Sequence, residues 1–303
     1  MPELPDLTIY IESLRSRIVG YPLLRVRIKS PSLLRSFDPP LSSVEGKRIL
    51  SLERIGKQIV WELEDGLFLV IHLMIAGRFH WKSAGAGGRG KTDLAAFDFS
   101  NGTLLLTEAS TLKRASLHVI RGRSALSPFD RGGLEVLTAS REVFRDALLR
   151  ENHTLKRALT DPRLFSAIGN AYSDEILHAA KISPLKLSRK LSEQEITTLH
   201  KVTREVLELW TERLRGQSGS AFPEKVTAFH PEMAVHGRFG KPCPVCRKTV
   251  QRIVYAANEC NYCPRCQTGG KILADRSLSR LLKDDWPDSI EDWEEMPGLG
   301  KTL

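Results

Sequence analysis

Cys243-Pro-Val-Cys246 and Cys263-Pro-Arg-Cys266 stand sixteen residues apart near the C-terminal end of this 303-residue chain. The spacing is typical of a zinc site, because each pair places two thiolates on one tight turn and two such turns complete a tetrahedral set of ligands. All four positions are then taken by sulfur, so we expect one structural Zn²⁺. Two disulfides are the alternative, and the lack of a secretory leader argues against them. The fifth cysteine, Cys260, is expected to be a buried spare thiol.

The segment between the two pairs predicts a β-hairpin. Gln251-Arg-Ile-Val-Tyr255 has the composition of a strand, and Asn258-Glu259 is interpreted as a turn. The cysteine pairs and this hairpin together predict a small zinc finger over residues 230–272.

Upstream of the finger, hydrophobic periodicity divides the chain into a strand-rich part and a helical part. A helix is expected over residues 5–19, and alternating patterns predict strands near residues 24–28, 47–54, 58–64, 67–73, 94–99, 103–107 and 116–120. These strands indicate a β-sandwich or flattened barrel over residues 1–135. Helical patterns follow at 141–150, from about 153, and from Ser192-x-x-Glu195, which is a capping box, to about 215. They predict a helical domain over residues 140–222.

The first residues, Met1-Pro2-Glu3-Leu4-Pro5-Asp6, have two interpretations. Removal of Met1 would leave Pro2 as an N-terminal secondary amine next to a carboxylate. Such an amine can attack a sugar C1′ and form an iminium, which drives base loss and then elimination. The alternative is a proline that merely begins the first turn of a helix.

The charge of the chain indicates a polyanionic partner. The net charge is +9 with a pI near 9.4, and residues 275–303 alone carry −4, so the remainder carries +13. A body this basic most often binds nucleic acid. No apolar run reaches the length needed to span a membrane, so we expect a cytoplasmic, DNA-associated protein.

Ile168-Gly-Asn170-Ala-Tyr-Ser173-Asp-Glu175 is a second candidate site. A Gly-Asn turn leads directly into a helix, for which Ser173 is a plausible cap. The free N–H groups of such a helix start suit a DNA phosphate. An ordinary corner between two helices explains the pattern equally well.

Five motifs in order resemble the formamidopyrimidine-DNA glycosylase/endonuclease VIII family over about residues 1–272. They are Pro2-Glu-Leu-Pro5, Arg54-Ile-Gly-Lys57, His72-Leu73 with Gly77, Ile168 to Leu177, and Gly237-Arg-x-Gly-x-Pro-Cys243 leading to Cys263-Pro-Arg-Cys-Gln267. The resemblance implies an α+β multidomain protein with an N-terminal β-sandwich, a helix–two-turn–helix domain and a four-cysteine finger. It also implies a bifunctional DNA glycosylase and abasic-site lyase.

The resemblance further implies roles for single residues. Pro2 would be the Schiff-base nucleophile, and Glu3 would help to open the sugar ring and move protons. Lys57 would contact phosphate and assist elimination. Asn170 would bind a backbone phosphate, and His72 is either a phosphate ligand or only a strand residue.

The sequence departs from the family at the side chains that fill the gap left by a flipped-out base. The family's methionine aligns with Ile75, one residue after Met74, and its arginine–phenylalanine loop aligns with Thr111-Leu-Lys113-Arg114-Ala115. Lysine lacks the flat fork of arginine, and alanine cannot wedge between bases. We therefore expect a preference for single-stranded or unpaired DNA.

The arginine of the family's zinc hairpin aligns with Asn258, which carries no charge. The altered contacts leave a second class of function open, a catalytically weak protein that binds damaged or unusual DNA. The intact Pro2, Glu3 and Lys57 favour the enzyme, which we expect to act as a monomer.

The acidic tail, residues 273–303, is longer than the family requires. Leu278, Leu281 and Leu282 form one face of a short predicted helix with Trp286, and Trp293 stands among acids. We interpret the tail as a segment that docks another protein, or as a solvated acidic end.

Overall fold

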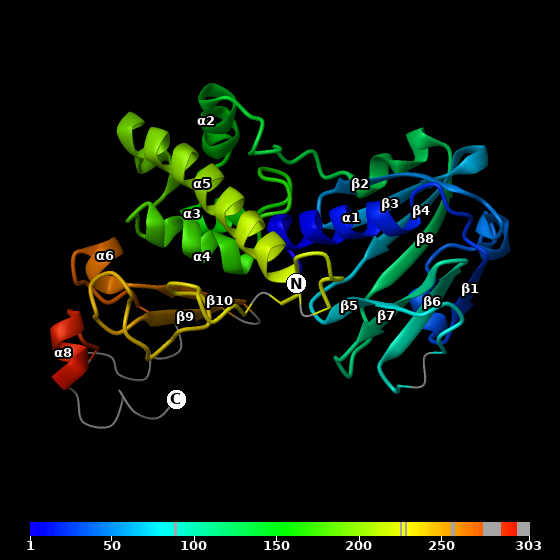
Figure 1. Cartoon of the computed structure of the whole chain (residues 1–303). Coiled ribbons are helices and arrows are strands. Elements are labelled where there is room, and N and C mark those ends of the chain that lie inside the picture. Colours follow the sequence, from blue (N-terminus) through cyan, green and yellow to red (C-terminus); the bar gives the residue numbers. More distant parts are fainter. Residues whose placement is uncertain (88–89, 225, 228, 256–257, 275–285, 296–303) are drawn as a thin grey trace. The chain divides into compact units, whose positions relative to one another are not determined.

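The computed structural model describes residues 1–303 except 88–89, 225, 228, 256–257, 275–285 and 296–303, and the side chains of Tyr255 and Asn258 (Figure 1). The chain forms two compact units. Unit 1 contains Met1–Arg131 and Leu209–Ala228, and unit 2 contains Gly132–Glu208 and Phe229–Leu303. The limits of the four predicted domains stay a prediction.

Unit 1 is a β-sandwich preceded by helix α1 (Leu4–Ile18), as the sequence predicted. One sheet has the strand order β1-β6-β7-β5 and the other the order β2-β3-β4-β8. The strands are β1 (Arg25–Ile28), β2 (Ile49–Ile55), β3 (Gln58–Leu63), β4 (Leu67–His72), β5 (Gly77–Lys82), β6 (Asp93–Phe99), β7 (Gly102–Glu108) and β8 (Ser116–Arg121). All pairings are antiparallel.

Large aromatic side chains fill the space between the two sheets. Trp61 from one sheet contacts Phe97 from the other, with ring centroids 5.1 Å apart, and both are fully buried. Tyr10 of α1 packs edge-on against Phe79. The helix therefore joins the same core and is held in a fixed position on the sandwich.

Strand β4 is buried on both faces, which explains its unbroken apolar sequence. Leu69 and Ile71 point into the main core, whereas Phe68 and Val70 pack outside it in a smaller cluster with Val60. Strand β5 has the alternation of a strand but was absent from the sequence prediction. Its Gly77 is required, because a Cβ atom there would lie 2.1 Å from the carbonyl oxygen of Leu73.

Unit 2 begins with helices that the sequence largely predicted. They are α2 (Arg141–Leu149), α3 (Leu155–Thr160), α4 (Asn170–Ala179) and α5 (Glu193–Ser218), of which α5 continues into unit 1. The capping box is confirmed: the Glu195 N–H donates to Ser192 Oγ, and the Ser192 N–H donates to Glu195 Oε2. Within the described residues, no helix combines the length and the apolar character needed to cross a membrane.

The predicted cap of α4 is wrong. The helix begins at Asn170 with Gly169 as its N-cap, so Ser173 lies inside the first turn. Its hydroxyl donates to the Gly169 carbonyl oxygen at 2.6 Å. The glycine places the chain in an extended conformation directly before the helix and, having no side chain, supplies no side-chain cap.

The finger contains the hairpin β9 (Gln251–Tyr255) and β10 (Asn258–Tyr262), followed by α6 (Pro264–Thr268). The predicted turn at Asn258-Glu259 is wrong, because Asn258 already pairs with Tyr255 as the first residue of β10. A hairpin between the cysteine pairs is confirmed.

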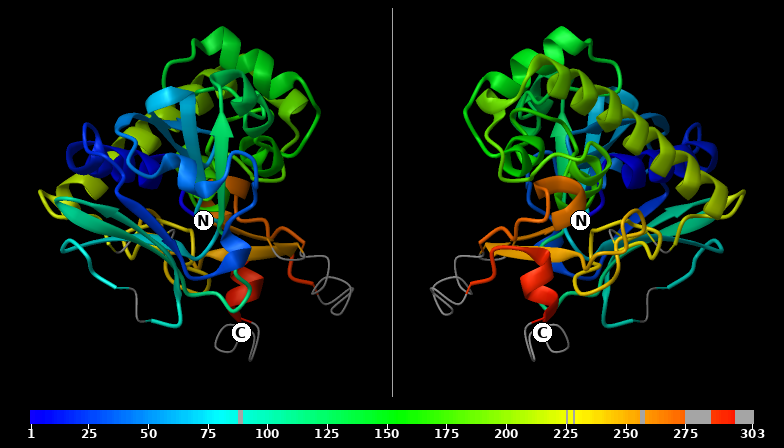
Figure 2. Two further views of the ribbon diagram at one scale, coloured as in Figure 1. Left: turned by 90° about the vertical axis from the view of Figure 1, so that its right-hand side faces the viewer. Right: turned by 90° about the vertical axis from the view of Figure 1, so that its left-hand side faces the viewer.

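The described part of the tail folds onto the finger. Helix α8 (Ile290–Glu295) lies beside the hairpin (Figure 2), and Lys248 Nζ bonds to Glu294 at 2.8 Å. Trp293 is only 4% exposed and packs against Ile272 and Ile290. This tryptophan is therefore buried, whereas Leu278, Leu281 and Leu282 lie outside the described residues, and docking of the tail on another protein stays a prediction.

Candidate functional site

Strand register brings several predicted site residues together at one end of the sandwich. His72, the last residue of β4, pairs with Gln58 and with Ser116, the first residues of β3 and β8. The hairpin turn Gly56-Lys57 therefore lies beside His72. The β4–β5 loop (residues 73–76) and the β7–β8 loop (residues 109–115) lie at this same end, because Gly77, which begins β5, pairs with Glu108, which ends β7.

The N-terminus is fixed by a reciprocal cap at the start of α1. Glu3 is the N-cap, and its carboxylate accepts the Asp6 backbone N–H, while Asp6 Oδ2 accepts the Glu3 N–H at 2.8 Å. Both carboxylates are buried. The cap holds Glu3 directly beside the chain terminus and next to the positive end of the helix dipole.

The surroundings of the terminal amine favour its unprotonated, nucleophilic form. Burial lowers the pKa of the Met1 amine, Arg78 and Lys57 lower it further, and the carboxylates of Glu3 and Asp6 oppose them. Lys57 and Glu3 are therefore neighbours of the amine, as their predicted roles require. A lowered pKa leaves a larger fraction of the amine unprotonated at a given pH, and only the unprotonated amine is a nucleophile.

His72 is a neutral ring that is oriented for donation. Burial lowers its pKa to about 4, with Lys57 and the N-terminal amine contributing. Its Nδ1 accepts the Met74 N–H at 3.0 Å, so in the neutral ring the proton sits on Nε2. His72 can therefore donate a hydrogen bond to a phosphate oxygen but adds no positive charge at neutral pH.

The β7–β8 loop is folded around the buried carboxylate of Glu108. This carboxylate accepts the backbone N–H groups of Arg114 and Ala115 at 2.9 and 3.1 Å, and the ammonium group of Lys113 bonds to the Glu108 carbonyl oxygen. Lys113 is thus turned back onto its own loop, whereas Arg114 is exposed.

Ala115 is 2% exposed and belongs to the sandwich core, so its own side chain is not presented at the surface. The exposed apolar residue of the loop is Leu112, at 63%, which the sequence analysis did not single out. In the neighbouring β4–β5 loop, Ile75 is 61% exposed, and Met74 before it has a positive φ of 54°. Two aliphatic side chains therefore project from adjacent loops.

Helix α4 holds the finger through polar side chains on one face. Asn170 Nδ2 donates to the Glu259 carbonyl oxygen at 2.9 Å, and Asp174 Oδ2 accepts the Asn261 N–H at 3.1 Å. One turn further on, His178 Nε2 lies 3.3 Å from Cys243 Sγ. The side chain of Asn170 is thus used inside the protein. The side chain of Asn258 lies outside the described residues.

The four predicted metal ligands come together. The Sγ atoms of Cys243, Cys246, Cys263 and Cys266 lie within 4.8 Å of one another, with separations of 3.9 Å for Cys243–Cys266 and 3.3 Å for Cys246–Cys263. A tetrahedral zinc with Zn–S bonds of about 2.3 Å needs sulfurs about 3.8 Å apart. The four thiols therefore fit one structural Zn²⁺. Cys260 lies apart, buried on β10, and burial raises the pKa of its thiol.

Three family models match consecutive parts of the chain. They describe the formamidopyrimidine-DNA glycosylase N-terminal domain (residues 1–113), the formamidopyrimidine-DNA glycosylase H2TH domain (residues 135–221) and the zinc finger found in FPG and IleRS (residues 240–269). A formamidopyrimidine-DNA glycosylase of Thermus thermophilus is 33% identical over 277 residues, covering 89% of this chain and 100% of the relative. The chain belongs to the formamidopyrimidine-DNA glycosylase family.

Other relatives within the family agree with this assignment. An uncharacterized formamidopyrimidine-DNA glycosylase-like protein of Mycobacterium tuberculosis is 43% identical over 152 residues, which are 50% of this chain and 94% of the relative. The structure of Lactococcus lactis Fpg with abasic-site DNA has a TM-score of 0.77 and 28% identity, and covers 88% of this chain and 99% of that one. A complex of the same enzyme with DNA containing an oxidized pyrimidine has the same TM-score and identity, with 88% and 100% covered.

Two residues of this glycosylase-family site were missed from the sequence. Asp6 was recognisable, since an acid three residues after Glu3 is the pattern of a reciprocal cap. Arg78 follows Gly77 at the start of β5, and its Nη1 donates to the Gly77 carbonyl oxygen at 2.6 Å. Its place next to the amine follows only from the fold, so no sequence pattern marked it.

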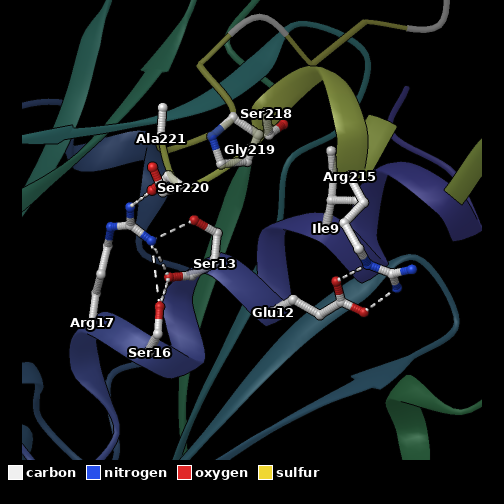
Figure 3. A pocket seen from close by; sticks show the side chains of 11 residues that line it. Ile9, Glu12, Ser13, Ser16, Arg17, Arg215, Ser218, Gly219, Ser220 and Ala221 are labelled. Atoms are coloured by element: carbon white, nitrogen blue, oxygen red, sulfur yellow. Dashed lines mark hydrogen bonds and ion pairs between the residues drawn. The ribbon is translucent and has the colours of Figure 1, made fainter. Parts of the chain in front are cut away.

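The glycosylase-family chain also has a polar pocket of about 530 Å³ between α1 and the end of α5 (Figure 3). Its cations are already paired: Arg215 makes two bonds to the Glu12 carboxylate, at 2.6 and 2.9 Å, and Arg17 donates to Ser13 and to the Ser220 carbonyl oxygen. These bonds link α1 to the last turn of α5 and to the residues that follow it, so they contribute to the stability of unit 1.

Proposed function

We propose that this protein is a DNA repair glycosylase with abasic-site lyase activity, acting through a Schiff base on Pro2. The observation that carries the proposal is the chain terminus, a buried amine with Glu3, Asp6, Arg78 and Lys57 as its charged neighbours. Removal of Met1 gives Pro2 the terminal amine among these same groups.

Base removal begins with attack of Pro2 on the sugar. The Pro2 nitrogen bonds to C1′ as the bond between C1′ and the damaged base breaks, and the C1′–O4′ bond then opens to give an iminium. The amine proton and one further proton, relayed by Glu3, end on the base and on O4′. The iminium withdraws electrons, so C2′ loses a proton to water. The electron pair of that C–H bond forms the C2′–C3′ double bond as the C3′–O bond breaks and releases the phosphate.

Neighbouring groups assist these steps by charge and by hydrogen bonding. Lys57 and Arg78 stabilise the phosphates on either side of the lesion, and neutral His72 donates from Nε2. The positive end of the α4 helix dipole, at Asn170, attracts a further phosphate. Because C1′ is inaccessible in a stacked duplex, the damaged nucleotide is flipped out before attack.

Reductive trapping tests the proposal directly. Borohydride reduces an iminium to a stable amine, so a Schiff-base enzyme becomes covalently attached to an oligonucleotide that contains an abasic site. A protein that only binds damaged DNA gives no such adduct.

A salt titration checks the role of Lys57. Lys57→Ala is expected to weaken binding to every DNA sequence, and the slope of log K against log salt should become shallower by about one unit per lost phosphate contact. Lys201→Ala is the matched control, because this lysine is exposed on α5 and pairs only with Glu205 in the described structure. An equal change of slope in both variants would contradict the assignment.

We propose further that the enzyme prefers unpaired DNA. The large apolar side chains that project from the β4–β5 and β7–β8 loops, Ile75 and Leu112, are aliphatic. They fill the gap left by a flipped base less well than an aromatic ring, so less of the unstacking cost of a few kcal/mol is recovered in a duplex. Single strands impose little of this cost.

The prediction is a higher single-turnover rate on one lesion in single-stranded DNA than in a duplex, with weak dependence on the opposite base. Leu112→Ala should lower the duplex rate several-fold and leave the single-strand rate unchanged, because only the duplex has a gap to fill. Leu112→Phe should raise the duplex rate. Leu24→Ala, at another exposed leucine of unit 1, serves as the control. A strong duplex preference that is insensitive to Leu112 would show that another residue fills the gap.

A further inference from the structure

Phe229 is an aromatic ring that is exposed and yet held in place. Its side chain is 67% exposed, and its ring stacks on His236 with centroids 5.4 Å apart and planes 23° apart. Gly237 makes this arrangement possible, because a Cβ atom there would lie 3.0 Å from Phe229 Cδ1. A phenylalanine ring that is exposed and also held against a second ring offers a flat surface on which another planar group can stack.

The support under the ring is rigid. His236 is buried, its Nδ1 bonds to Asp174 Oδ2 at 2.8 Å, and its backbone N–H donates to Glu175 Oε1 at 3.0 Å. Asp174 is fully buried and also receives Lys156 Nζ at 2.6 Å. Both the ring and the backbone of His236 are therefore fixed, and a ligand on Phe229 meets a surface that needs little ordering.

The ring is close in the fold to the proposed phosphate site. Asp174, which holds His236, lies one helical turn after Asn170, the first residue of α4. One turn is about 5.4 Å along the axis. A strand whose phosphate sits at the start of α4 thus carries its neighbouring bases within reach of this part of unit 2.

We propose that Phe229 is a stacking platform for an unpaired DNA base. The inference rests on the proposed function, and it adds a base-binding site in unit 2 to the chemistry of unit 1. A flat aromatic ring accepts any base through its π face, whereas bases inside a duplex are already stacked and unavailable. The occupant is therefore an unpaired nucleobase beside a bound phosphate, which agrees with a preference for single strands.

Fluorescence of 2-aminopurine tests the platform in the full-length zinc-loaded protein. The probe is placed at successive positions flanking an abasic-site analogue in a single strand, and stacking on a ring quenches its emission. Wild type should quench at one position, and Phe229→Ala should lose that quench and bind about tenfold more weakly. Phe229→Tyr should restore both. Phe37→Ala, at a phenylalanine that is 87% exposed in unit 1, should behave as wild type.

Each other outcome decides against the platform. Unchanged quenching and affinity in Phe229→Ala would show that the ring serves another partner, such as a protein. Weaker binding without a change of quenching would mean that the ring contacts the sugar–phosphate backbone. Zinc content and melting temperature equal to wild type exclude misfolding as the cause.

The test also separates this inference from the proposed function. Borohydride trapping of the wild-type protein reports on the Pro2 amine, whereas the 2-aminopurine quench reports on Phe229. A protein that quenches through Phe229 but never forms an adduct would overturn the Schiff base and leave the platform standing.

Discussion

Protein that begins at Pro2 is expected to form a covalent adduct with abasic-site DNA under borohydride, whereas protein that retains Met1 is expected to form essentially none. In the longer chain the Pro2 nitrogen is part of a tertiary amide, so its lone pair is delocalised into the Met1 carbonyl group and it has no N–H proton to lose. Loss of a nucleophile of this kind lowers rates on the order of a thousandfold or more. Intact-mass analysis separates the two forms, and gel-resolved trapping measures each of them.

Substitutions refine the same experiment. Pro2→Gly keeps a terminal amine, although a primary one, and should retain part of the trapping. Pro5→Ala is the matched control, since it removes a proline from the same first turn of α1 without touching the amine. Equal trapping by the Met1-retaining form would disprove the assignment of Pro2.

The parts of the fold that were predictable are those that local pattern determines. Alternation gave seven of the eight strands of unit 1, and the box Ser192-x-x-Glu195 marked the start of α5, because side-chain period and capping depend on near neighbours. The four-cysteine site was predictable for the same reason, since two short loops carry all of its ligands.

The errors arose where a residue's environment depends on distant segments. Ala115 aligned with a DNA-facing position, but the Glu108 carboxylate draws the loop inward and leaves Leu112 outside. Trp293, which stands among acids in the sequence, is covered by Ile272 and Ile290. Glu108 lies seven residues before Ala115 and Ile272 lies on another segment than Trp293, so the periodicity of a strand or a helix does not indicate these two contacts.

The polar face of α4 shows the same limit. Asn170, Asp174 and His178 are spaced four residues apart, so the sequence places them on one side of the helix. It does not tell that they bond to Glu259, Asn261 and Cys243 of the finger. In the structure these bonds join α4, whose N-terminal end is the proposed phosphate-binding site, to the zinc finger. We therefore expect zinc to support the position of this helix as well as the fold of the finger.

Replacing one zinc ligand should therefore affect DNA binding as well as the finger. Cys263→Ser is expected to reduce zinc from one per chain to near zero, because three thiolates bind far more weakly than four and the binding free energy of a structural zinc is folding free energy. Without zinc, β10 loses its anchor next to Cys263, and the bonds from Glu259 and Asn261 to α4 loosen with it. Elemental analysis and DNA titration measure the two effects.

Cys260→Ser makes the same change of atoms at a buried cysteine outside the cluster, and it should leave both the zinc content and the DNA affinity near wild type.

His178→Phe is an intermediate case: it removes the ring nitrogen beside Cys243 Sγ but leaves all four ligands, and hydrogen bonds of this kind are worth about 10- to 100-fold in metal affinity. A chelator should therefore strip zinc from His178→Phe faster than from wild type and slower than from Cys263→Ser. Well-folded wild-type protein that contains no zinc would refute the site, whereas a Cys263→Ser protein that loses zinc but binds DNA normally would show that α4 holds its phosphate-binding end without the finger.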